Sequence, residues 1–139
     1  MKYIVLIAVL LLIVVVIEGF QFYRRIQIGR MLSLQVQPFS YRIENPSMRI
    51  LVVGDSTGVG TGAQNNNDST AGRFHKDFPQ AEIINLSKNG LRTKQAREIL
   101  SKQEGKFDLV LLQIGANDIL RFTPLSQVSE DMRELIQKA

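Results

Sequence analysis

The 139-residue sequence contains no cysteine and only one histidine, His75. Without cysteine the chain has neither disulfides nor thiol chemistry, and it suits a reducing or an oxidising compartment equally well. The single histidine leaves one position at which an imidazole base could act. Internal repeats are also absent, and the only low-complexity stretch is the run of three asparagines at 65–67. We expect no cofactor and no metal.

The folded part of the chain also lacks an excess of charge. Residues 51–139 contain eleven basic and eleven acidic side chains, so the net charge of +4 comes from residues 1–50. A nucleic-acid partner would need a basic face on the folded part, and none is expected. The basic excess instead flanks the apolar N-terminal segment, where it suits anionic lipid headgroups.

The N-terminal segment is apolar without interruption from Tyr3 to Ile17. A helix extended to Tyr23 is about 31 Å long, which matches a hydrocarbon layer roughly 30 Å thick. Tyr3 and Tyr23 would then lie at the two interfaces, where aromatic residues are favoured. We therefore expect a single-pass membrane protein anchored by residues 3–23.

Two alternatives to this anchor remain open. Lys2 followed by an apolar core is typical of a signal peptide, but residues 15–20 lack the two spaced small residues that cleavage needs. A buried core helix is the second alternative. For orientation, Arg24, Arg25 and Arg30 outweigh Lys2 and the amino terminus by one charge. This excess favours the following domain inside, but a margin of one charge leaves the orientation open.

The chain is expected to have three parts: a transmembrane anchor at 1–23, a linker or stalk at 24–46 and a folded domain at 47–139. Residues 24–37 carry both the alternation of a strand and the pattern of an amphipathic helix that continues the anchor. Pro38 and Pro46 then interrupt the chain before the folded domain.

Strands and helices alternate in the folded domain. Strands are predicted at 48–53, 82–86 and 107–114. Helices are predicted at 69–78, at 93–103 and from Pro124 onward, the last with an apolar stripe of Leu125, Val128, Met132, Leu135 and Ile136. This alternation predicts a parallel sheet with right-handed crossovers.

Each predicted strand is followed by a polar corner that contains glycine. The three corners are Gly54-Asp55-Ser56, Asn85 through Gly90, and Gly115-Ala116-Asn117-Asp118. In a parallel sheet they fall at one edge, where open α/β folds build their active sites. Ser56 is a candidate nucleophile, while the Asn117 amide and the Gly90 N–H are candidate donors to a developing oxyanion. Taken singly, these residue types are also common in caps and turns.

Taken together, the three corners resemble those of the SGNH (GDSL) hydrolases, over about residues 48–139. The resemblance implies a flavodoxin-like three-layer α/β/α fold with strand order 2-1-3, and serine ester hydrolysis. It implies Ser56 as the nucleophile, and an oxyanion hole made by the Ser56 N–H, the Gly90 N–H and the Asn117 side chain. Supporting positions are Gly54, Asp55, Gly115 and Asp118, of which the two aspartates organise the turns.

One part of the family pattern is missing. The family places its catalytic acid and base in a D-x-x-H motif after further strands, and this sequence contains no such motif. Gly72 stands three residues before His75, which is expected on the surface of a helix. As written, the chain is expected to form an incomplete domain in which residues 107–114 are an edge strand. We also expect it to be an impaired enzyme.

Two rival functions are also compatible with parts of the sequence. Residues 58–63 formally match the dinucleotide motif G-x-G-x-x-G/A, but the match begins four residues beyond Gly54, and no acidic residue ends the second strand. The other rival is a membrane-tethered binding module or degenerate fragment without turnover. For an enzyme, the expected substrate is a small-molecule or envelope ester, such as an acylated lipid or carbohydrate, with the domain on the extracytoplasmic side.

Overall fold

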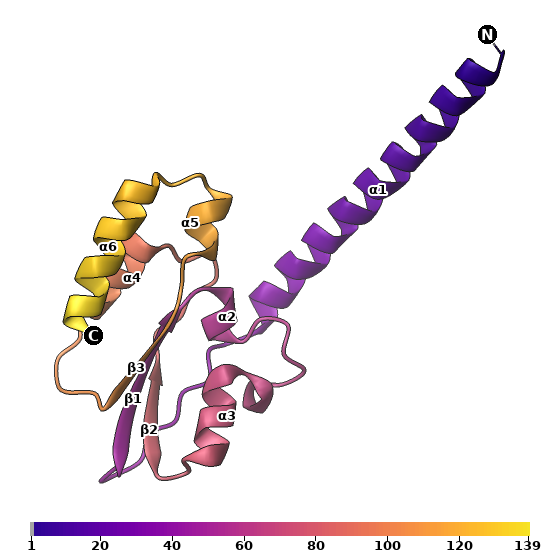
Figure 1. The fold of residues 1–139 in the computed structure, drawn as a ribbon. Helices are drawn as coiled ribbons and strands as arrows, with labels where there is room; N and C mark the ends of the chain where they lie inside the picture. The colour runs from indigo at the N-terminus through magenta and orange to yellow at the C-terminus, as the bar shows by residue number, and fades with distance from the viewer. Residues whose placement is uncertain (1) are drawn as a thin grey trace. The chain divides into compact units, whose positions relative to one another are not determined.

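The computed structural model describes residues 2–139. The chain divides into two compact units, and the boundary along the sequence lies between Gln35 and Val36. The first unit is one helix, α1 (Lys2–Gln35) (Figure 1). By length and composition it can cross a membrane, and none of its most apolar stretch is buried. Of the two alternatives for residues 24–37, the structure shows the helical one, because α1 continues without a break to Gln35.

The second unit alternates strands and helices. Its strands are β1 (Met48–Gly54), β2 (Ala81–Asn85) and β3 (Leu109–Gln113). Its helices are α2 (Ser56–Val59), α3 (Thr70–Asp77), α4 (Thr93–Leu100), α5 (Ala116–Leu120) and α6 (Leu125–Lys138), with a short 3-10 helix, η1 (Asn66–Asp68). The three predicted strands and the three longer helices are confirmed. The short helices α2, α5 and η1 were not predicted.

The three strands form a parallel sheet in the order β2-β1-β3, which confirms the predicted order. Ile50 of β1 lies opposite Ile83 on one side and Leu109 on the other. Within the described residues, β3 pairs with β1 alone, so it is the predicted edge strand. Its five residues are all half-buried.

The central strand β1 is buried on both faces, so its side chains belong to two hydrophobic clusters, one on each face of the sheet. Leu51 and Val53 pack with residues of α4 and α6. Ile50 and Val52 pack on the opposite face with Ala71 of α3. Figure 1 shows α4 and α6 on one side of the sheet and α3 on the other. The molecule therefore has the three layers expected of an α/β/α fold.

The outer edge of β2 is covered by residues that precede β1. The Tyr41 N–H donates to the Ile83 carbonyl at 2.8 Å, and the Ile83 N–H donates back to Tyr41 at 2.7 Å. Phe39 and Tyr41 pack against the α3-side cluster. The prediction of His75 as a surface side chain is wrong, because its half-buried ring lies against Tyr41, with centroids 4.0 Å apart.

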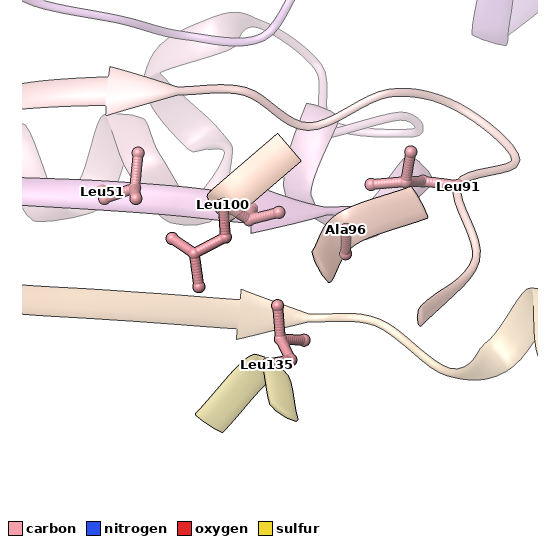
Figure 2. Packing of buried hydrophobic residues seen from close by; sticks show 6 residues of the cluster. Leu51, Leu91, Ala96, Leu100 and Leu135 are labelled. Atoms are coloured by element: carbon pink, nitrogen blue, oxygen red, sulfur yellow. The ribbon is translucent and has the colours of Figure 1, made fainter. Parts of the chain in front are cut away.

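Helix α6 packs on α4 through part of its predicted stripe. Leu135 is fully buried, whereas Leu125 and Ile136 are 81% and 61% exposed, so the stripe is narrower than predicted. Figure 2 shows Leu135 close to Ala96 and Leu100 of α4 in one cluster. Arg97 of α4 also pairs with Asp131 and Glu134 of α6, at 3.1 and 2.8 Å.

Leu135→Ala should lower the free energy of unfolding by about 2–5 kcal/mol, because it leaves a cavity in the cluster between the sheet and α6. Urea unfolding of the full chain in mild detergent, followed by circular dichroism, measures this loss. Ile136→Ala is the matched control on the exposed side of α6 and should change the value by less than about 0.5 kcal/mol. Equal effects of the two variants would contradict the packing of α6 described above.

Candidate active site

The three polar corners lie at the carboxyl edge of the sheet and are hydrogen-bonded to one another. The Asp55 N–H donates to the Gln113 carbonyl at the end of β3, at 2.8 Å. The Lys88 N–H donates to the Gly54 carbonyl at the end of β1, at 3.0 Å. The corner after β1 is therefore fixed to both neighbours, as parallel pairing requires.

Ser56 is the first residue of the short helix α2 and is half-buried. Asp55 caps this helix, since its Oδ1 accepts from the Thr57 N–H at 2.9 Å and from the Thr57 hydroxyl at 3.0 Å. Within the part of the chain that the structure describes, neither the Ser56 hydroxyl nor its N–H has a hydrogen-bond partner. Both groups are thus available to a ligand at this corner.

Asn117 lies in the first turn of α5, on the next corner. Its Nδ2 donates a long hydrogen bond of 3.4 Å to Oδ2 of Asp55. A carboxylate only accepts hydrogen bonds, so this contact selects the amide nitrogen, not the oxygen, for the side that faces Asp55. The second N–H of the same amide is left for another acceptor.

Gly90 turns the chain between β2 and α4 with a φ of +77°, a conformation that side chains with a Cβ rarely adopt. The turn is closed by the Leu91 N–H, which donates to the Lys88 carbonyl at 3.1 Å. The Gly90 N–H has no partner among the described residues. It is therefore a third available donor, in addition to those of Ser56 and Asn117.

Asp118 joins the corner after β3 to the start of α4. Its buried Oδ2 accepts from the Thr93 N–H at 2.9 Å and from the Thr93 hydroxyl at 2.8 Å. The residue before Thr93 is Arg92, whose side chain has no acceptor atom, so the Asp118 side chain supplies the acceptor that this helix end needs. Gly115, the first residue of the same corner, is the N-cap of α5 and has a φ of +117°.

Sequence reasoning missed the layer of side chains below these corners. Asn85 is buried at the end of β2, donates to the Gly58 carbonyl of α2 at 2.9 Å and accepts from the Ser87 N–H at 3.0 Å. Gln113 at the end of β3 donates to the Thr70 hydroxyl of α3 at 3.1 Å. The signal available in the sequence is a polar residue at the last position of an otherwise apolar strand.

His75 does not join this site. Its ring packs against Phe39 and Tyr41, at centroid distances of 5.5 and 4.0 Å, and its Nδ1 is buried without a hydrogen-bond partner among the described residues. None of these contacts involves the corners at the strand ends. In the described residues, no group of three or more His, Cys, Asp or Glu is arranged to hold a metal ion.

A cavity of about 480 Å³ is lined in part by the β2–α4 corner. Its walls come from the segment before β1, the β2–α4 corner and the end of α4, and they include Gln37, Ser87, Lys88 and Lys102. Ser56, Gly90 and Asn117 are not among its lining residues. The candidate site is thus separate from this cavity.

The family model described as the GDSL-like Lipase/Acylhydrolase family matches residues 52–139. The chain belongs to this family, and the predicted SGNH/GDSL resemblance is confirmed. No curated protein matches the chain.

Solved structures of esterases share the fold. AlinE4, an SGNH-hydrolase family esterase, superimposes with a TM-score of 0.58 at 23% identity, over 69% of this chain and 55% of its own. The psychrotrophic esterase EstA from Pseudoalteromonas sp., crystallised with monoethylphosphonate as inhibitor, gives 0.52 at 24% identity, over 66% and 53%. A possible lipase from Chitinophaga pinensis gives 0.54 at 19% identity, over 66% and 43%. The chain thus spans about half the length of these proteins.

Asp118→Ala should lower the free energy of unfolding by about 1.5–3 kcal/mol, because it removes the charged acceptor of two buried hydrogen bonds at α4. Urea unfolding of the full chain measures the loss. Glu130→Ala, which removes an exposed carboxylate on α6, is the control and should have little effect. In a double-mutant cycle with Thr93→Val, additive effects would contradict a direct contact between Asp118 and Thr93.

Gly58→Ala should destabilise the site by about 1–3 kcal/mol, because the added Cβ would lie 3.0 Å from Cβ of Ser87 and closer still to its hydroxyl. Replacing Ser87 with alanine removes the nearer of these atoms. The cost of Gly58→Ala in urea unfolding should therefore be smaller in a Ser87→Ala background. An undiminished cost would show that the crowding lies elsewhere.

Proposed function

We propose that residues 36–139 form the nucleophile and oxyanion half of a serine ester-hydrolase site, held at a membrane by α1. The single observation that carries the proposal is the set of unpartnered groups at the strand ends, namely the Ser56 hydroxyl, the Ser56 and Gly90 N–H groups and one Asn117 N–H. A nucleophilic hydroxyl beside donors for an oxyanion is what acyl transfer requires.

In the proposed reaction, the Ser56 oxygen attacks the ester carbonyl and the carbonyl oxygen takes up negative charge. The backbone N–H groups of Ser56 and Gly90 and the Asn117 amide donate to that oxygen. Asp55 takes part indirectly, because its contact with Asn117 at 3.4 Å turns the amide nitrogen toward this corner. One donor of this kind contributes roughly 10²–10³ in rate in serine hydrolases.

Proton transfer is the weak step of the proposed site. The one histidine in the sequence, His75, packs against Phe39 and Tyr41, which are not part of the corners, so we do not expect its imidazole to accept the Ser56 proton. Loss of the base in a serine triad costs about 10⁴–10⁶ in rate. We therefore expect impaired turnover by the chain as written. The same observation favours the second candidate function, a tethered module that binds an ester without turning it over.

The proposed substrate is an ester of the cell envelope, either an acylated lipid or an acylated carbohydrate, met on the extracytoplasmic side. Support comes from α1, which is long and apolar enough to span a membrane. Its most apolar part precedes Arg24 and Arg25, so the basic residues would lie at the headgroups.

A serine-reactive fluorophosphonate tests the proposal on the full chain in detergent. We expect slow labelling of one site, abolished by Ser56→Ala and retained by Ser126→Ala, which removes an exposed serine of α6. Asn117→Ala should slow labelling by about 10²-fold, since it removes one oxyanion donor. Added imidazole should accelerate labelling, because it supplies the missing base.

Two results separate the candidate functions. Labelling that persists in Ser56→Ala, or none even with imidazole, would exclude a nucleophilic Ser56. Absence of labelling even with imidazole, together with retained binding of an ester analogue, would favour the binding module.

A further inference from the structure

Four large apolar side chains are exposed on the segment that follows Asn117. Ile119 and Leu120 of α5 are 73% and 74% exposed, Phe122 is 92% exposed, and Leu125 at the start of α6 is 81% exposed. We call these four residues the apolar rim. Single exposed apolar residues are ordinary, but four within seven residues form a patch of the kind that marks an interaction site.

The backbone holds the apolar rim in an ordered turn. Phe122 has a φ of +53°, which is unfavourable for a bulky residue. Hydrogen bonds fix it there, since the Phe122 N–H donates to the Ile119 carbonyl at 3.1 Å and the Thr123 N–H donates to the Asp118 carbonyl at 2.9 Å. The turn thus presents the Phe122 ring to solvent instead of folding it back on the sheet.

The surroundings of the apolar rim are basic. Residues 119–129 contain Arg121 and no acidic side chain, and residues 88–96 contain Lys88, Arg92 and Lys94 and no acidic side chain. The two segments meet where Asp118 binds Thr93 and where the Arg121 guanidinium lies beside Gly90. Asp118 itself is buried, so it does not offset the charge at the surface.

We propose that the apolar rim is a membrane-docking surface that enters the boundary between headgroups and acyl chains of a bilayer containing anionic lipids. Apolar side chains beside lysine and arginine are the combination that binds such a surface. A second copy of the chain fits less well, because a two-fold contact would bring the two basic segments together. If α1 spans the membrane, the tether keeps the bilayer at high effective concentration.

Docking would bring the candidate active site to the membrane surface, because Asn117 and the apolar rim belong to α5, the turn that follows it and the start of α6. This inference goes beyond ester hydrolysis, since it does not require Ser56 to be reactive. It is therefore tested in a Ser56→Ala background, where failure of docking and failure of catalysis are distinguishable.

Tryptophan fluorescence provides the test, because the chain has no tryptophan of its own. The full chain carrying Phe122→Trp is reconstituted in vesicles of phosphatidylcholine and phosphatidylglycerol, with and without brominated acyl chains. Phe78→Trp, at a residue 47% exposed on the C-cap of α3, is the matched control. Phe20→Trp reports on α1 itself.

We expect a blue-shifted emission from Phe122→Trp and quenching by brominated lipid several-fold stronger than for Phe78→Trp. Omitting phosphatidylglycerol or raising the ionic strength should weaken the quenching at 122 but not at 20. Adding Leu120→Glu to Phe122→Trp should abolish the quenching at 122, whereas Gln127→Glu, with the same change in charge at an exposed polar site of α6, should retain it.

Quenching at 122 no stronger than at 78 would overturn the proposal, whatever is observed at 20. A blue shift at 122 that depends on protein density and is insensitive to brominated lipid would also overturn it, in favour of contact between copies.

Discussion

Two buried carboxylates hold the three strand ends in their relative positions. A carboxylate removed from water must receive hydrogen bonds, and Asp55 and Asp118 find donors on different segments of the chain. Asp55 connects the start of α2 to Asn117, and Asp118 connects the β3–α5 corner to the start of α4. The candidate nucleophile and its donors therefore take their positions from two aspartates that belong to the same motifs.

Asp55 and Asp118 can connect these segments because the sheet register aligns the ends of the three strands along the strand direction. Gly54 lies opposite Gln113 of β3, and Val52 lies opposite Asn85 of β2, so the three chains leave the sheet within two residues of one another. That offset is about 7 Å along a strand. It follows from parallel pairing to a central strand that is buried on both faces, and the hydrophobic clusters on the two sides stabilise this pairing.

Much of this arrangement is readable from local sequence. The apolar run before Gly54 predicts a buried strand, and a glycine-containing polar corner after each strand predicts the edge at which Ser56, Gly90 and Asn117 gather. What local patterns omit are contacts between distant segments. Three such contacts join residues at least 25 positions apart, and no spacing rule connects them: Asn85 with Gly58, Thr93 with Asp118, and Tyr41 with Ile83.

Helix α2 has four residues and α5 has five, too few for a hydrophobic period to show. The stripe of α6 was overestimated for a related reason, because periodicity defines a face of a helix but not how much of that face a neighbour covers.

The same contacts place the candidate nucleophile and the candidate oxyanion donors on three consecutive corners. The sheet pairing that builds the fold also brings these corners to one edge of the sheet. A base has no such link to the corners, and His75 is held elsewhere by Phe39 and Tyr41. In serine hydrolases the oxyanion hole and substrate binding alone retain roughly 10³–10⁴ in rate over water, about 4–5 kcal/mol, whereas loss of the base costs about 5–8 kcal/mol. Under the proposed function, the corners at the strand ends supply the smaller of the two contributions, and the larger one depends on a proton acceptor other than His75.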